Sequence, residues 1–165
     1  MVPQIKTILF ATDLSKNSAY AFYYAVHMAK RDDAKIVILH AVEPLPHMAI
    51  TFRDFPQKVA KNRWDETVKK FKERIQDISV KVDTQMGISS VDLVSNILIR
   101  PGSPAEEILK VADEESCDVI VLGTHGKGVL KQTLLGSVSN SVLLRTRKPV
   151  FVVPLPSEDT DIDLI

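Results

Sequence analysis

The chain has 165 residues, a length that predicts one domain with a single substantial core. Its 21 basic side chains balance its 21 acidic ones, so charge favours neither nucleic acid nor an anionic membrane surface as a partner. No apolar run approaches the roughly 18 residues of a membrane span, and the first residues lack a signal-peptide layout, so we expect a cytoplasmic protein.

Five short apolar runs are predicted to be strands. Most are continuous rather than alternating, which indicates strands buried on both faces of a parallel sheet. Helical stretches lie between them, and this alternation favours right-handed βαβ units and an open parallel sheet with helices on both faces. The predicted strands are Ile5 to Ala11, Lys35 to Val42, Ser95 to Arg100, Asp118 to Gly123 and Pro149 to Val153.

Two of the intervening helices have clear start signals. Ser15 can cap the first helix. Ser103 is followed by Pro104 and then Glu106, which predicts a capping box with proline at the first helical position. Cys117 is the only cysteine, so no intramolecular disulfide or cysteine-based zinc site is possible, and we expect a small core residue there.

The middle of the chain allows two interpretations. Apolar residues recur at spacings of three and four from Trp64 to Val82, which predicts one long helix up to about Gly87. Alternation of Ile78, Val80 and Val82 also allows a strand, but we prefer the helix because the stripe begins well upstream and keeps its phase. Residues 87–96 then allow an extra strand, or one long strand over 91–100. Residues 44–56 contain three prolines and predict an exposed loop.

A glycine-rich stretch carries the clearest functional signal. Gly123-Thr124-His125-Gly126 is followed by nine residues and then Gly136-Ser137, between an apolar run and a predicted helix over 138–145. Glycines at a strand exit allow a close ligand approach, and a helix entrance offers free backbone N–H groups, which suits phosphate. The stretch is neither a P-loop nor a dinucleotide fingerprint, because Gly128 follows Lys127 and Lys131 occupies the third glycine position.

This spacing resembles the ATP-binding signature of the universal stress protein family. Asp13 after the first strand, the end of the second strand at His40, Ala41 and Val42, and Pro101 to Pro104 before a helix follow the same family order. The resemblance covers roughly residues 1–154, which we expect to form the domain, with 155–165 as an acidic, mobile tail. It implies a Rossmann-like sheet of order 3-2-1-4-5, which would bring the loops of Asp13 and Gly123 together where the strand order reverses.

The resemblance also implies a division of roles within one nucleotide site. Asp13, with Ala11 and Thr12 before it, would bind ribose hydroxyls or the adenine amino group, although capping of the first helix is an equal alternative. Ala41 would offer its backbone to the adenine edge. Phosphates would meet the loop and the helix entrance, whose candidate residues are Gly123, His125, Gly126, Gly136, Ser137, Val138 and Ser139. For Ser137 an ordinary N-cap is the alternative, and for His125 a solvated loop side chain.

The ligand implied is ATP, with ADP or AMP as alternatives, and any Mg²⁺ is expected on the nucleotide phosphates. A metal cluster of His40, Glu43 and His47 is disfavoured because prolines interrupt them. No nucleophile–base pair or kinase loop stands out. We therefore expect a nucleotide-binding regulatory protein of the stress response, with no catalytic residue assigned. The alternatives are a slow ATPase or autophosphorylating protein and a nucleotide-free dimerisation module.

The last strand is expected to mediate homodimerisation. In the order 3-2-1-4-5, Pro149 to Val153 would lie at a sheet edge, and an exposed apolar edge invites pairing with another chain. The family resemblance implies antiparallel pairing about a two-fold axis. Prolines at both ends of the strand would limit the pairing and help fix its register.

Overall fold

A computed structural model describes residues 2–43, 57–124 and 135–156 of the chain. Five parallel strands form one sheet in the order β3-β2-β1-β4-β5. The strands are β1 (Thr7–Ala11), β2 (Lys35–Val42), β3 (Val94–Pro101), β4 (Val119–Gly123) and β5 (Val150–Val153). The fold class and the strand order expected from the sequence are confirmed.

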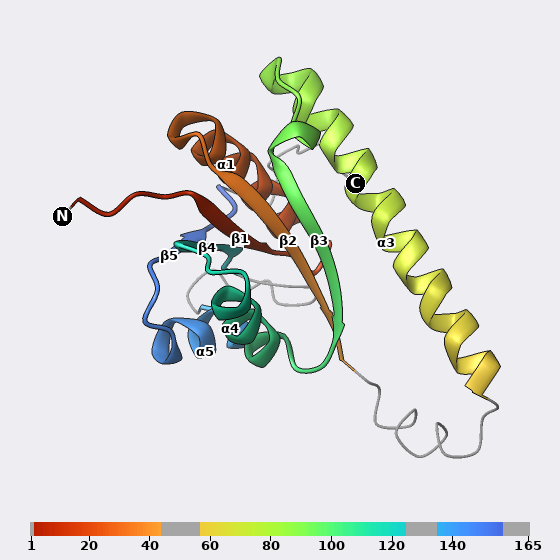
Figure 1. Ribbon diagram of the computed structural model, residues 1–165. Helices are drawn as coiled ribbons and strands as arrows, with labels where there is room; N and C mark the ends of the chain where they lie inside the picture. Colours follow the sequence, from red (N-terminus) through yellow and green to blue (C-terminus); the bar gives the residue numbers. More distant parts are fainter. Residues whose placement is uncertain (1, 44–56, 125–134, 157–165) are drawn as a thin grey trace.

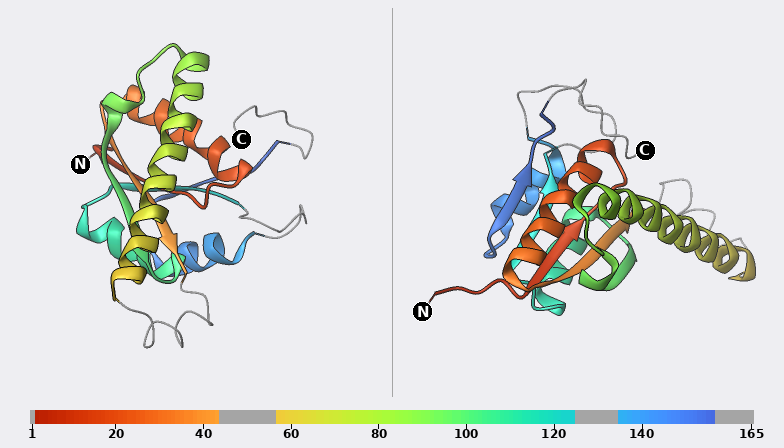
Figure 2. Two further views of the ribbon diagram at one scale, coloured as in Figure 1. Left: turned by 90° about the vertical axis from the view of Figure 1, so that its right-hand side faces the viewer. Right: turned by 90° about the horizontal axis from the view of Figure 1, so that it is seen from above.

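Helices cover both faces of this sheet. They are α1 (Lys16–Asp32), α3 (Gln57–Met86), α4 (Pro104–Glu114) and α5 (Ser137–Arg145). Figure 1 shows α1 and α3 on one face and α4 and α5 on the other, and in the left view of Figure 2 α1 lies above the strands and α4 and α5 lie below them. Because successive strand residues point to opposite faces, each strand contributes to two cores. Ile8 and Phe10 face α1 and α3, whereas Leu9 and Ala11 face α4 and α5.

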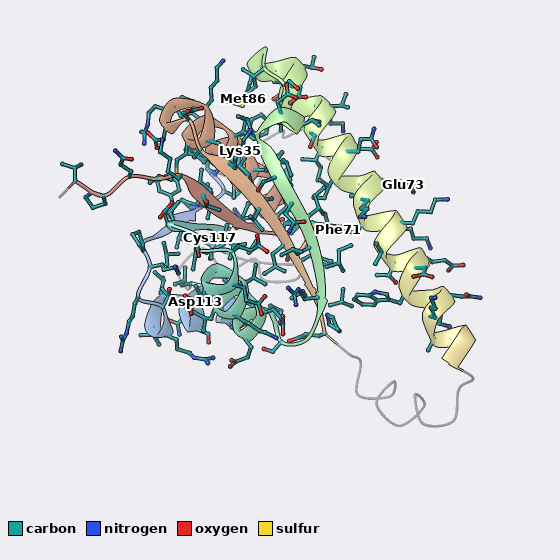
Figure 3. All side chains as sticks on the ribbon, in the orientation of Figure 1. Lys35, Phe71, Glu73, Met86, Asp113 and Cys117 are labelled. Atoms are coloured by element: carbon teal, nitrogen blue, oxygen red, sulfur yellow. The ribbon has the colours of Figure 1, made fainter. Side chains whose placement is uncertain are left out.

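The long helix predicted for the middle of the chain is confirmed as α3. Its apolar stripe is buried in the core at Phe71, Ile75, Ile78 and Val82, and Figure 3 shows Phe71 between the helix and the sheet. Val80 is 58% exposed, so the alternating pattern around it reflects the helix and not a strand.

The segment after α3 differs from both interpretations of the sequence. Gly87 takes a left-handed φ of 64°, and its N–H and that of Ile88 both donate to the Asp83 carbonyl, which ends the helix. The Asp83 carboxylate then accepts from the Ser90 N–H at 2.7 Å. A 3₁₀ turn, η1 (Val91–Leu93), follows, and β3 begins only at Val94, so there is neither an extra strand nor one long strand.

The predicted helix starts are confirmed in part. Ser15 caps α1, since its hydroxyl oxygen accepts from the Ser18 N–H. Pro104 opens α4 as predicted, but the Ser103 side chain makes no capping bond, so the capping box is wrong. Glu106 instead pairs with Arg145 of α5 and ties the two helices of that face together.

Smaller differences concern the element ends. The first strand begins at Thr7, two residues later than expected, and Cys117 is buried before β4 as predicted.

Within the described residues no helix is both long and apolar enough to cross a membrane. The loop expected over 44–56 and most of the tail, 157–165, lie outside the described residues.

Candidate functional site

A cavity of about 410 Å³ lies at the carboxyl ends of β1, β2 and β4, where the strand order reverses. Parallel α/β sheets bind ligands at this place, and the volume lies within the usual range of small-molecule sites. Every predicted site residue within the described part of the chain lines this switch-point cavity. These residues are Ala11, Thr12, Asp13, Ala41, Gly123, Gly136, Ser137, Val138 and Ser139.

The loop between β1 and α1 holds Thr12 and Asp13 in a tight, internally bonded turn. Thr12 Oγ1 accepts from the Leu14 N–H at 3.0 Å and lies 2.9 Å from the Ser18 hydroxyl. Asp13 Oδ1 accepts from the Ser15 N–H at 2.9 Å, while Leu14 takes a φ of 62°. Asp13 therefore supports the turn before the helix, and the alternative that it caps α1 is wrong, because Ser15 is the cap.

The end of β2 forms the second wall of the cavity. The register pairs Ala11 with Leu39, so Ala41 lies two residues further along, beside the β1–α1 loop. His40, between them, has its Nδ1 atom 2.8 Å from the Thr12 carbonyl oxygen. Because a carbonyl only accepts, Nδ1 carries the proton in this bond. The imidazole thereby fixes the backbone immediately before Asp13.

The exit of β4 packs closely against the Asn17 side chain and the entrance of α5. A Cβ atom on Gly123 would lie 2.7 Å from Asn17 Oδ1 and 2.9 Å from Asn17 Cγ. The Gly123 carbonyl oxygen accepts from the Ser139 hydroxyl at 2.7 Å, and the Thr124 carbonyl oxygen accepts from the Gly136 N–H at 2.7 Å. The strand exit is thus bonded directly to the entrance of α5.

The entrance of α5 presents backbone donors to the cavity. Gly136 is the N-cap, and no side chain of the described residues caps the helix, so Ser137 is its first helical residue and not the N-cap that the sequence allowed. The Ser139 hydroxyl is buried and engaged by Gly123, which leaves the exposed Ser137 as the cavity-lining hydroxyl of this turn. Backbone N–H groups at the positive end of a helix dipole favour an anion.

Two predicted residues, His125 and Gly126, lie outside the described residues, as do Lys127, Lys131 and His47. Among the residues the structure describes, no group of three or more His, Cys, Asp and Glu side chains could hold a metal ion. His40 is engaged with Thr12 and stacks on Phe71, which explains its position without a metal.

Sequence analysis missed several residues that line the cavity. They are Ser18, Leu39, His40, Glu43, Pro104, Ile108, Leu122 and Thr124. His40 directly precedes Ala41 and Glu43 follows it by two residues, so closeness to Ala41 in the sequence was the signal that could have found them. Ile108 reaches the cavity from α4, a helix that packs on one face of the sheet, and no local sequence pattern could have indicated this contact.

Fold and site together define an α/β protein with a ligand cavity at the switch point of a parallel sheet. Residues 4–154 match the universal stress protein family, and the chain belongs to that family. The universal stress protein MJ0531 of Methanocaldococcus jannaschii is 31% identical over 157 residues, which cover 93% of this chain and 85% of the relative.

Solved structures agree with this assignment. The structure of MJ0577 from the same organism is 26% identical, with a TM-score of 0.71 and coverage of 93% of this chain and 99% of that one. The universal stress protein from Archaeoglobus fulgidus in complex with dAMP is 19% identical, with a TM-score of 0.58 and coverage of 92% and 99%. At that identity the second structure supports the fold alone.

Proposed function

We propose that this protein binds an adenine nucleotide in the switch-point cavity, with ATP as the expected ligand and ADP or AMP as alternatives. The observation that carries the proposal is the entrance of α5, whose residues Gly136 to Ser139 line the cavity at the reversal of strand order and which no side chain of the described residues caps. A helix end with free N–H groups is the feature that phosphate needs.

The remaining lining of the cavity suits a nucleoside. Leu39, Ile108 and Leu122 supply apolar surface, and Ala41 lies at the end of β2, where its backbone can meet the edge of a base. Asp13, an acceptor when ionised, can take hydrogen bonds from ribose hydroxyls. An apolar wall with a few oriented polar groups is the usual composition of a small-molecule site.

The proposal does not include a protein-bound metal or a committed reaction. Mg²⁺ would be held by the nucleotide phosphates and by water, as is common for this ion. Slow ATP hydrolysis would use the same cavity, so phosphate release over hours is the measurement that separates binding from turnover. The dAMP complex of the Archaeoglobus protein is compatible with the proposal, which rests on the cavity of this chain. A regulatory role in the stress response and a cytoplasmic location are proposed from family membership.

Mass spectrometry of the purified, heat-denatured protein tests the proposal most directly. We expect a co-purified adenine nucleotide, and calorimetry with the stripped protein should then give saturable binding of ATP. Guanosine triphosphate, which carries the same phosphates on a different base, is the matched control. Absence of both a co-purified nucleotide and calorimetric binding would refute the proposal.

We also propose that the chain forms a homodimer through β5. This strand lies at the edge of the sheet, and Phe151 on it is 40% exposed. The ring of Phe151 packs against Tyr24 of α1, with centroids 5.8 Å apart, so the edge continues into an aromatic surface on that helix. An apolar edge strand next to exposed aromatic rings is suited to antiparallel pairing with a second copy.

A further inference from the structure

Asn17, the second residue of α1, joins three segments that are far apart in the sequence. Its side chain is buried, with 8% of the residue exposed. Its amide Nδ2 donates to the Val153 carbonyl oxygen at 3.0 Å, and its Oδ1 accepts from the Thr124 hydroxyl at 3.2 Å. The amide orientation is fixed, because a flipped side chain would place two carbonyl oxygens against each other.

The same amide explains the glycine at position 123. A Cβ atom there would meet Asn17 Oδ1 at 2.7 Å and Cγ at 2.9 Å, closer than non-bonded atoms can approach. The φ of Gly123 is not in the left-handed region, so its backbone conformation does not require glycine. The close approach of the Asn17 side chain does require it.

From this point the bonding continues to the entrance of α5. The Thr124 N–H donates to the same Val153 carbonyl oxygen at 3.1 Å, so this oxygen accepts twice. The Thr124 carbonyl oxygen accepts from the Gly136 N–H and the Gly123 carbonyl oxygen from the Ser139 hydroxyl, both at 2.7 Å. Asn17 thus holds the strand exit to which the first turn of α5 is bonded.

We propose that Asn17 is a positioning residue, which holds the exit of β4 against the end of β5 and so sets the place of the α5 N–H groups that face a phosphate. This inference rests on the proposed nucleotide site for its ligand. It adds that the phosphate side of the cavity is held by a side chain that does not line the cavity itself.

A double-mutant cycle without ligand tests the contact. Asn17→Ala removes the two atoms that a Cβ at position 123 would meet below 3.0 Å and leaves only the Asn17 backbone carbonyl carbon at 3.3 Å, while Val153 keeps its bond from the Thr124 N–H. We expect Gly123→Ala to lower Tm by about 4 °C or more in the native background and by less than half as much in the Asn17→Ala background. Equal shifts in both backgrounds would overturn the inference.

A binding experiment tests the positioning role. Asn17→Ala should weaken ATP binding about tenfold, the equivalent of roughly 1.4 kcal/mol, and leave adenosine affinity within about twofold. Adenosine lacks phosphates and so reports only on the nucleoside side. Equal losses for the two ligands would mean that Asn17 serves the fold in general, and would also overturn the inference.

Failure of the proposed function remains distinguishable. If the native chain binds neither ATP nor adenosine, the nucleotide site and the phosphate role of Asn17 are both wrong, while the ligand-free cycle still decides whether Asn17 dictates Gly123. If ATP binds normally to the native chain and Asn17→Ala leaves its affinity unchanged, the nucleotide site stands and the positioning role is wrong.

Discussion

The imidazole of His40 lies parallel to the phenyl ring of Phe71, with ring centroids 4.6 Å apart and planes 4° apart. His40 donates from Nδ1 to the Thr12 carbonyl oxygen at 2.8 Å, so the stack connects α3 to the loop that carries Asp13. The ring of Phe71 is buried, and the imidazole packs against one face of it. Packing on one face of the protein therefore fixes a backbone segment of the cavity.

Replacing Phe71 by leucine tests this connection. The substitution keeps an apolar side chain but removes the ring contact, which should lower the free energy of unfolding by about 1 kcal/mol in urea. Adenosine affinity should also fall, because the Thr12 backbone loses its fixed donor. Phe22→Leu is the control, since Phe22 is also fully buried but its ring packs against Phe10, whereas that of Phe71 stacks on His40. If both variants bind adenosine equally well, the stack does not reach the site.

A bulky side chain at Gly136 should block the phosphate side of the cavity. Gly136 is the N-cap of α5 and lines the cavity at a φ of −59°, which any residue can adopt. Gly136→Val should therefore fold normally but lower ATP affinity at least about tenfold, roughly 1.4 kcal/mol, by covering the N–H groups. Calorimetry and a ligand-free thermal melt measure the two effects. Unchanged affinity in a folded variant would refute the phosphate assignment.

Two substitutions of Asp13 separate its role in the β1–α1 turn from its role in ligand binding. Asp13 Oδ1 accepts from the Ser15 N–H, and an asparagine at this position can keep that bond while it loses the charge. Asp13→Ala should weaken both ATP and adenosine by about 1–2 kcal/mol, whereas Asp13→Asn should preserve Tm and lose only part of the affinity. A loss confined to ATP would mean that Asp13 acts at the phosphates.

The sequence predicted what depends on local pattern. Continuous apolar runs indicated buried parallel strands, and the stripe through Phe71 and Val82 indicated one long helix, because side-chain periodicity follows directly from backbone geometry. The strand order came from the family resemblance, since no local pattern says which strands are neighbours. The family resemblance also identified the cavity-lining glycines and serines, because the spacing of the loop between Gly123 and Ser137 matches the family signature.

The remainder depends on contacts between distant residues. Asn17 lies 107 positions from Thr124 and 136 from Val153, so no residue near Asn17 in the sequence indicates that it contacts them. The capping box failed because Glu106 has a competing partner, Arg145, on another helix. Local start signals state what a side chain can do, and tertiary packing decides which partner it takes.

Burial of Cys117 gives a prediction about alkaline pH. Burial raises the pKa of its thiol from 9.0 to about 11, against a smaller opposite effect of Lys148. Between these values the unfolded chain has lost the proton that the folded chain retains, so stability falls as pH rises, by at most about 1.4 kcal/mol per pH unit. Urea unfolding of the native chain and of Cys117→Ala at pH 8, 9 and 10 should show a shallower fall in the variant. Parallel falls would place the titration elsewhere.

The homodimer proposed through β5 can be tested without disturbing the sheet. The carbonyl oxygens of Pro149 and Val153 accept from the N–H groups of Ile120 in β4 and of Thr124 directly after it. In a parallel ladder the alternate residues Val150 and Val152 therefore direct their backbone groups to the open edge. Val152→Pro removes one of these outward donors and should shift the equilibrium toward monomer. Val152→Ala, which keeps the donor, is the control and should remain dimeric. Sedimentation at micromolar concentration measures both, and a monomeric native chain would rule the dimer out.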